Sequence, residues 1–401
     1  MRVALTCHAN PSHLVGVLAA ARALRLGGHD VAVASGPAVG DRIARAGFPL
    51  LPVASLLSMD EMMRARAGAV RPARPGRPPA HPFVTPSTSG QAAEITTVLG
   101  AWKPDCVLRD STEMGGYVAA ECLGVPSGTV DIAPLSPVAR DGALPELNRL
   151  RAGFDLPPVS DPWHPVRPFR VGLVPDVFYP DGLRWPGARH YRPSTADDRA
   201  DAEAAASLAR PAGAGPLVLA SLGMNAPHCD PRSTTVLNAI IEALGGLPVT
   251  GVVALGSGTD PGRWPGARAA NVHLAAFVPQ RAMLRSCDLF LTHGGFNGVR
   301  EAFDAGVPMV AVPFFGDHPA TAARLADLGL ATPLDLAAVT AATVRAAVAA
   351  VLADTGFQAR AGLMQQRMRA LPPLDRLADD LEAFVARTAN HVTSSTGRQR
   401  S

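Results

Sequence analysis

A strand, a glycine turn and a helix follow one another between residues 287 and 304. Residues 287–292 form a short apolar run of strand length, and Val299, Ala302 and Phe303 recur at helical spacing within 296–304. His293-Gly294-Gly295 joins the two. A strand that turns directly into a helix is the unit from which parallel α/β sheets are built. The segment therefore predicts an α/β fold with a ligand site at the carboxyl edge of a parallel sheet.

The polar residues of this segment suit a nucleoside diphosphate. Two glycines let the backbone approach a ligand closely, and the start of a helix favours an anion. His293 and Asn297 can donate hydrogen bonds to phosphate oxygens, and Glu301 follows Asn297 by one turn, where a carboxylate suits a ribose diol. A further apolar strand at 307–312 leads to Asp317 and His318, expected in a loop that holds sugar hydroxyls.

The amino-terminal half opens with a strand at 2–6, a helix up to Gly27 and a strand at 29–34. His13 lies at the start of this helix, and Asp110 ends a strand at 104–110 that precedes a second helix. An imidazole acts best as a base when an acid holds its other nitrogen. Asp110 also fits a helix-capping role, and both roles stay open. His8, in the preceding loop, is the weaker candidate for a base.

The segment 277–318 resembles the donor-binding signature of family 1 glycosyltransferases, and nearly the whole chain fits their two-domain layout. The resemblance implies a GT-B fold, in which two Rossmann-like lobes with parallel sheets flank a cleft. It also implies donor-binding positions for the base, ribose, diphosphate and sugar. These are Phe277, Val278 and Gln280 for the base and its ribose, Glu301 for the ribose, His293, Gly294, Gly295, Asn297 and Gly298 for the diphosphate, and Asp317 and His318 for the sugar.

The resemblance further implies a metal-independent, inverting transfer to oxygen. His13 keeps the family's distance from the segment 28–31 and takes the position of the general base, with Asp110 as its acidic partner. The expected acceptor is a small lipophilic natural product, as in antibiotic biosynthesis. No cofactor is implied, because the nucleotide sugar is a co-substrate. A UDP-hexose is favoured as donor, and a dTDP-deoxysugar is the alternative.

Several positions depart from the family pattern. Gly298 replaces a small hydroxyl residue, and His318 replaces the commoner Gln. Ser12 and Gly16 replace a Gly and a Pro beside His13. Asn225 stands where a hydroxyl residue near the diphosphate is usual, and it is the expected substitute contact. These changes keep open a catalytically silent protein that binds sugar nucleotides, while a sugar-nucleotide epimerase or a lipid-intermediate transferase fits the signature less well.

The expected domain boundaries follow breaks in the strand and helix pattern. We expect an acceptor-binding lobe at 1–205, including a mobile loop at 62–90 rich in Pro, Arg and Gly. A nucleotide-sugar lobe is expected at 206–372, after an irregular linker within 180–215. A helix at 373–390 is expected to cross back to the first lobe, followed by a disordered tail at 391–401.

Composition limits the partners. The net charge is +3 with acids and bases dispersed, so neither a nucleic-acid groove nor an anionic-membrane patch is expected. The five cysteines lack a C-x-x-C pair, which favours buried free thiols in a reducing cytoplasm. No signal peptide and no run of eighteen apolar residues occurs, so we expect a soluble protein. Homodimerisation stays open.

Overall fold

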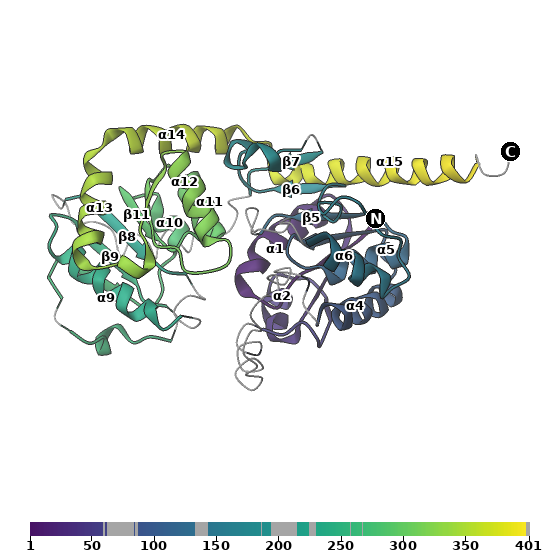
Figure 1. Ribbon diagram of the computed structural model, residues 1–401, viewed down its shortest axis with the longest axis horizontal. Coiled ribbons are helices and arrows are strands. Elements are labelled where there is room, and N and C mark those ends of the chain that lie inside the picture. Colours follow the sequence, from purple (N-terminus) through teal and green to yellow (C-terminus); the bar gives the residue numbers. More distant parts are fainter. Residues whose placement is uncertain are drawn as a thin grey trace. The chain divides into compact units, whose positions relative to one another are not determined.

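The computed structural model of the chain describes residues 1–58, 61, 84, 87–132, 143–185, 187–193, 215–223, 230–256, 258–266 and 268–397. These residues belong to two compact units (Figure 1). The first unit comprises Met1–Leu173, Gly182–Ser194 and Pro372–Ser401. The second comprises Val174–Asp181 and Thr195–Leu371.

The first unit contains a seven-stranded sheet in the order β3-β2-β1-β4-β5-β6-β7, with every neighbouring pair parallel. Its strands are β1 (Arg2–Thr6), β2 (Asp30–Ser35), β3 (Leu50–Pro52), β4 (Cys106–Asp110), β5 (Ser127–Val130), β6 (Arg170–Gly172) and β7 (Ala188–His190). Its helices are α1 (Pro11–Leu26), η1 (Pro37–Val39), α2 (Gly40–Arg45), α4 (Thr88–Trp102), α5 (Gly115–Leu123), α6 (Ala143–Ala152), η6 (Leu374–Arg376) and α15 (Leu377–Gly397), with η3 (Asp181–Leu183) at the chain boundary of the units.

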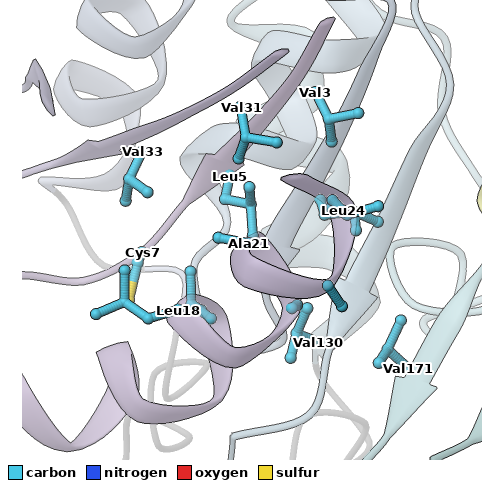
Figure 2. Close-up of a cluster of buried hydrophobic side chains, with 14 of the residues drawn as sticks. Val3, Leu5, Cys7, Leu18, Ala21, Leu24, Val31, Val33, Val130 and Val171 are labelled. Atoms are coloured by element: carbon cyan, nitrogen blue, oxygen red, sulfur yellow. The ribbon is translucent and has the colours of Figure 1, made fainter. Parts of the chain in front are cut away.

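Successive side chains of β1 point alternately into two hydrophobic clusters, one on each face of the sheet. Val3 and Leu5 join a cluster with α1 and α15, which includes Leu24 (Figure 2), whereas Ala4 joins another with α4 and α5. Neighbouring residues of a strand point to opposite faces, so helices cover both sides of this sheet. Burying a side chain such as Leu24 stabilises the fold by about 1.5–3 kcal/mol.

The second unit contains a six-stranded sheet in the order β10-β9-β8-β11-β12-β13, again with parallel pairs. Its strands are β8 (Leu217–Ser221), β9 (Thr250–Ala254), β10 (Val272–Ala275), β11 (Leu289–Thr292), β12 (Met309–Ala311) and β13 (Ala331–Pro333). Its helices are η2 (Asp176–Phe178), α9 (Arg232–Gly245), η4 (Pro261–Arg263), α10 (Gln280–Leu284), α11 (Phe296–Ala305), α12 (His318–Asp327), η5 (Leu336–Ala338), α13 (Ala341–Ala353) and α14 (Thr355–Ala370). The predicted pair of parallel α/β units is therefore correct.

Each sheet has one point at which the strand order reverses. In the first unit it lies between β1 and β4, and in the second between β8 and β11. Chains leave neighbouring strands in opposite directions at such a point, which opens a crevice at the carboxyl ends of the strands. The crevice of the first sheet is reached by the loops after Thr6 and Asp110, and that of the second by the loops after Ser221 and Thr292.

Several predicted boundaries differ from the structure. The stretch predicted as irregular linker contains the edge strand β7, whose residues Ala188–His190 lack an apolar run that would have indicated a strand. The predicted boundary at 205 lies outside the described residues. The segment Val174–Asp181 belongs to the second unit because Arg324 donates to the carbonyls of Val177 and Phe178 at 2.8 and 2.9 Å.

Two further boundaries lie near the ends of predicted segments. Helix α15 continues to Gly397 rather than ending at 390, since no Pro or Gly interrupts it earlier. Helix α4 begins at Thr88, inside the predicted loop 62–90, although most of that loop lies outside the described residues.

Candidate active site

The first crevice brings His13 and Asp110 together, as predicted from the sequence. His13 lies in the first turn of α1, after β1, and Asp110 is the last residue of β4, the neighbouring strand. The His13 Nδ1 and Asp110 Oδ2 atoms are 2.5 Å apart. The Asp110 side chain is fully buried, whereas that of His13 is 21% exposed. A buried acid thus holds one nitrogen of an imidazole that solvent can reach.

The second oxygen of Asp110 is also fixed. Its Oδ1 accepts hydrogen bonds from the Thr112 backbone N–H and hydroxyl, both at 2.8 Å. Burial alone would favour the neutral acid, yet His13, His8 and the Thr112 N–H together hold the pKa of Asp110 well below its ordinary value. Asp110 is therefore an ionised hydrogen-bond acceptor. It does not cap α5, because that helix starts later, at Gly115.

His8 supports the pair rather than replacing it. Its Nε2 lies 3.2 Å from the Thr112 carbonyl oxygen. Its ring meets the His13 ring edge to face, with centroids 5.7 Å apart. Within the described residues His8 makes no hydrogen bond to a carboxylate, although its ring lies close enough to Asp110 to lower the pKa of that acid. Among the described residues, His13 is therefore the histidine of this loop that is hydrogen-bonded to a carboxylate, and its role as the base stays a prediction.

A buried layer behind Asp110 was not predicted. The Arg109 guanidinium, with no exposed surface, donates to the carbonyls of Glu113 at 2.8 Å and Pro165 at 2.5 Å. Burial lowers the pKa of Arg109 to about 10, so the group keeps its charge at neutral pH. The Glu113 carboxylate accepts from the Thr6 hydroxyl at 2.5 Å and from the Gly115 N–H at 2.6 Å. An arginine inside an apolar strand is the sequence signal that could have indicated this layer.

Two departures from the family pattern near His13 have local structural reasons. Asn10 caps α1, since its Oδ1 accepts from the Ser12 N–H at 3.0 Å and the Ser12 hydroxyl at 2.9 Å. Gly16 is buried, and a Cβ atom there would lie 2.9 Å from Ile132 and 3.1 Å from Leu173. Ser12 thus strengthens the helix start, and Gly16 lets α1 approach neighbouring residues closely.

The second crevice holds His293 in a cage of glycines. Gly294 has φ +81°, and Gly295 is the N-cap of α11. A Cβ on Gly223 would lie 2.6 Å from the His293 ring, and one on Gly295 would overlap it. Burial lowers the pKa of His293 to about 4, although a backbone hydrogen bond at Ser221 favours the charged ring. Its Nδ1 is buried and has no hydrogen-bond partner among the described residues. The helix start and this unsatisfied nitrogen lie together, as an anion site requires.

His318 packs directly on His293. The two rings meet edge to face, with centroids 4.7 Å apart, and the Phe315 ring lies 4.9 Å from His318 on a tilted plane. The Phe315 N–H donates to His318 Nδ1 at 3.4 Å. Burial, and next the neighbouring His293, lower the pKa of His318 to about 3. The predicted loop position is wrong for His318, which is the first residue of α12 after the N-cap Asp317.

The remaining predicted donor residues lie on α10, α11 and the loop before α10. Phe277 is 71% exposed, so its ring is available for stacking, and the neighbouring Val278 is buried. Gln280 Nε2 donates to Glu301 Oε2 at 2.8 Å. Asn297 lies in the first turn of α11.

Two predicted features cannot be compared with the structure. Asn225 and the larger part of the loop 62–90 lie outside the described residues. Within the described part of the chain, the cysteines Cys7, Cys106, Cys122 and Cys287 are free, as predicted. Cys7 and Cys106 are buried, whereas Cys122 is exposed and Cys287 is half-buried.

Comparisons with known proteins agree with this geometry. The sequence model of the family described as UDP-glucoronosyl and UDP-glucosyl transferase matches residues 187–391, about half of the chain. The tylactone mycaminosyltransferase of Streptomyces fradiae is 28% identical, with 100% of this chain and 95% of the relative aligned. In the part of the chain that the structure describes, no helix is long and apolar enough to span a membrane.

Solved structures share the fold over nearly the whole chain. The calicheamicin glycosyltransferase CalG4 aligns with a TM-score of 0.79 at 22% identity, covering 97% of this chain and 99% of its own. The spinosyn rhamnosyltransferase SpnG complexed with thymidine diphosphate aligns with a TM-score of 0.75 at 21% identity, covering 95% of this chain and 100% of its own. Two parallel α/β units in one chain are thus the architecture of known glycosyltransferases.

Proposed function

Because the chain belongs to the UDP-glucoronosyl and UDP-glucosyl transferase family and is therefore a GT-B glycosyltransferase, we propose that it moves a sugar from a dTDP-sugar to a hydroxyl group of a small lipophilic acceptor, with His13 as general base. The observation that carries this proposal is the His13–Asp110 pair at the point where the first sheet reverses its strand order. Ligands of open α/β sheets bind at such points.

The proposed reaction is a single displacement at the anomeric carbon. Nδ1 of His13 is held by the Asp110 carboxylate, so Nε2 is the nitrogen that takes the proton from the acceptor hydroxyl. The acceptor oxygen forms its bond to the anomeric carbon as the bond from that carbon to the diphosphate breaks. The nucleoside diphosphate leaves with the bonding electron pair, and the configuration inverts. Asp110 stabilises the imidazolium that results, because it stays ionised.

The leaving diphosphate is assigned to the start of α11. Backbone N–H groups after Gly295 and the helix dipole stabilise negative charge there. The buried Nδ1 of His293, which has no hydrogen-bond partner within the described part of the chain, lies at the same turn. A phosphate oxygen close to this ring favours its protonated form, in which both nitrogens donate. Asn297 is assigned to the phosphates, and Asp317 with His318 to the sugar.

Relatives support a dTDP-sugar as donor. Among the similar proteins are the TDP-daunosamine transferase DnrS of Streptomyces peucetius, at 27% identity, and the SpnG complex with thymidine diphosphate. A UDP-hexose, predicted from the segment 277–297, is the second candidate. It is favoured by the description of the family and by a 37% identical match over 120 residues to the NDP-glycosyltransferase YjiC of Bacillus subtilis.

The acceptor is proposed to be a lipophilic natural product, in line with relatives whose names refer to tylactone and aklavinone. We also propose that no metal is required, because His293 and the start of α11 take the role of stabilising the diphosphate. The free described cysteines are consistent with a reducing cytoplasmic compartment.

The proposal is tested by incubating the purified protein with dTDP-glucose, dTDP-deoxysugars and UDP-hexoses against phenolic, polyketide and macrolide acceptors. Products are identified by mass spectrometry. A sugar mass gain that disappears in His13→Ala supports the proposal. The matched variant His8→Ala removes the adjacent imidazole and is expected to lose far less turnover. Equal losses in the two variants contradict the assignment of His13 as base.

A further inference from the structure

Three ionisable side chains lie fully buried within five residues at the end of β4. Arg109, Asp110 and Glu113 have no exposed surface, and Asp110 is the partner of His13. Two buried carboxylates this close together repel each other, and the repulsion favours a proton on one of them. A buried cation that touches the same loop opposes this repulsion and helps both acids to stay ionised.

The guanidinium of Arg109 is such a cation. Its Nη1 donates to the carbonyl oxygen of Glu113 at 2.8 Å and lies 3.2 Å from that of Asp110 and 3.3 Å from that of Ser111. The group therefore lies against the backbone that carries both acids. Burial lowers the pKa of Arg109 to about 10, against the attraction of Glu113 and Asp110, which favours the charged form. Arg109 thus stays charged at neutral pH and offsets part of the negative charge.

The Glu113 carboxylate is surrounded by hydrogen-bond donors. Its Oε1 accepts from the Gly115 N–H at 2.6 Å, and its Oε2 accepts from the Gly116 N–H at 2.9 Å and the Thr6 hydroxyl at 2.5 Å. A protonated acid needs an acceptor for its O–H group, and a backbone N–H cannot serve as one. These contacts suit an ionised acid, so Glu113 is a second buried negative charge near Asp110.

Two further ionisable groups at this layer remain neutral. Burial, and next the charges of Asp110 and Glu113, raise the pKa of the Cys7 thiol, whose Sγ lies 3.9 Å from Asp110 Oδ2. Burial also raises the pKa of Tyr117, whose ring centroid lies 5.8 Å from the Arg109 guanidinium carbon. Neither side chain adds a charge to the layer at neutral pH.

His8 and Asp131 also face the layer. The Nε2 of His8 lies 3.2 Å from the Thr112 carbonyl oxygen, and after His13 this ring is among the groups that lower the pKa of Asp110. Asp131 attracts Arg109, but it has a cation of its own, because the Arg170 Nε donates to it at 2.8 Å. The charge of Arg109 is thus left mainly to the two acids of its own loop.

We propose that Arg109 and Glu113 are positioning residues of opposite charge that set how readily the His13–Asp110 pair takes up a proton. The positive charge of Arg109 opposes protonation of the pair, and the negative charge of Glu113 favours it. The inference rests on the proposed function for its catalytic meaning, since it takes His13 as the base. It goes further because it assigns the adjustment of that base to two buried charges behind its acidic partner.

The experiment is an NMR titration of the full-length protein with isotope-labelled histidines, in which the variant His13→Ala identifies the His13 signal. At an effective dielectric constant of about 20, a unit charge about 10 Å away shifts a titration midpoint by about one pH unit. We therefore expect the His13 midpoint to rise by at least about half a unit in Arg109→Gln and to fall by at least about half a unit in Glu113→Gln. Shifts of the same sign, or an unchanged midpoint in either variant, overturn the inference.

The variants separate charge from shape. In Glu113→Gln the amide oxygen can accept from the glycine N–H groups while the amide NH₂ group donates to the Thr6 hydroxyl, so the contacts persist without the charge. Arg109→Lys keeps the charge but loses the planar set of donors, and its midpoint should stay within about 0.3 unit of the original. A rise in Arg109→Lys as large as that in Arg109→Gln overturns the role of the charge.

A matched control removes a positive charge elsewhere on the same strand unit. Lys103 is exposed and precedes β4, whereas Asp110 is its last residue, so Lys103→Gln should leave the His13 midpoint in place. A shift in this control equal to that in Arg109→Gln would show that net charge, rather than the buried layer, sets the midpoint, and would overturn the inference. If Arg109→Gln does not fold, Glu113→Gln and Arg109→Lys still decide the question.

The outcome is separable from that of the proposed function because the titration requires no turnover. If the midpoints shift in opposite directions and no acceptor is glycosylated, the proposed function fails while the inference about the buried charges stands. If turnover depends on His13 and the midpoints do not move, the inference alone fails. In an active protein, the acid limb of the kcat/KM profile should move in the same direction as the NMR midpoint of each variant.

Discussion

Replacing Asp110 by Asn is expected to inactivate His13 by reversing its tautomer. The Thr112 N–H is an obligate donor to Oδ1 of Asp110, and the Thr112 hydroxyl donates to the same atom. These donors fix the amide oxygen of an Asn at the Oδ1 position. The amide NH₂ group then faces His13 Nδ1 and donates to it, so the ring proton must move to Nε2. An Nε2 that carries a proton cannot take one from the acceptor.

The size of the effect follows from losing the base while keeping the shape. General-base catalysis contributes about 10²–10⁴-fold, so kcat of Asp110→Asn should fall by about that factor, equivalent to roughly 3–5 kcal/mol in the barrier. Affinity for dTDP should stay within about two-fold, because the residues proposed to bind the donor belong to the other unit. The assay measures initial rates for kcat and calorimetry for dTDP binding.

The matched control is Cys7→Ala. Its Sγ lies 3.9 Å from the same Oδ2 atom, so the change perturbs the surroundings of Asp110 without altering its charge or the His13 contact. This variant should keep most of its turnover. Comparable thermal unfolding of both variants excludes a global effect. If Asp110→Asn keeps more than about a tenth of wild-type kcat while His13→Ala is inactive, the tautomer argument is refuted.

Three other predictions follow from the same structure. Burial lowers the pKa of His293 to about 4 and that of His318 to about 3, below the value of 6.5 in the unfolded chain. As the pH falls below 6.5, the unfolded chain therefore binds protons at these groups before the folded protein does, and the folded protein loses stability. His318→Gln removes one of these groups. Between pH 7 and 5 the unfolding free energy of this variant should fall by about 2 kcal/mol less than that of the unchanged protein, as measured by chemical denaturation. An equal fall in the two proteins would show that His318 does not contribute. Gly116→Ala should destabilise the protein by more than about 2 kcal/mol, because the new methyl group would overlap the Glu113 carboxylate and the Thr6 hydroxyl that donates to it. The control Gly90→Ala on α4 places its methyl group in open space, and it should be neutral or slightly stabilising in the same unfolding assay. Chelation of divalent metals should leave turnover unchanged, and activity that is lost with chelator and restored by Mg²⁺ would contradict the metal-independent mechanism.

Much of the fold follows from local patterns in the sequence. The apolar run at 2–6 became β1 at its predicted place, and α11 begins at Phe296 as expected. The pattern is reliable there because strands buried on both faces are almost wholly apolar. The same reasoning missed β7, since a three-residue edge strand needs no such run.

The candidate site divides in a similar way. His13 and Asp110 could be paired from sequence because each follows a recognisable strand, and the carboxyl ends of parallel strands share an edge. The contact between Gln280 and Glu301 could not, because it depends on the packing of α10 against α11. Likewise, the membership of Val174–Asp181 in the second unit depends on hydrogen bonds from Arg324, which lies far from this segment in the sequence.

The glycine cage around His293 has a consequence for how this site can evolve. A methyl group at position 223 or 295 would occupy the space of the imidazole ring, and Gly223 also has φ +73°. Neither glycine can be replaced while the ring keeps its position, and replacing the ring alone leaves a void between them. Single substitutions at these three positions therefore pass through impaired intermediates. Related chains with a different residue at position 293 are expected to differ at 223 or 295 as well, so that the three positions change as a group.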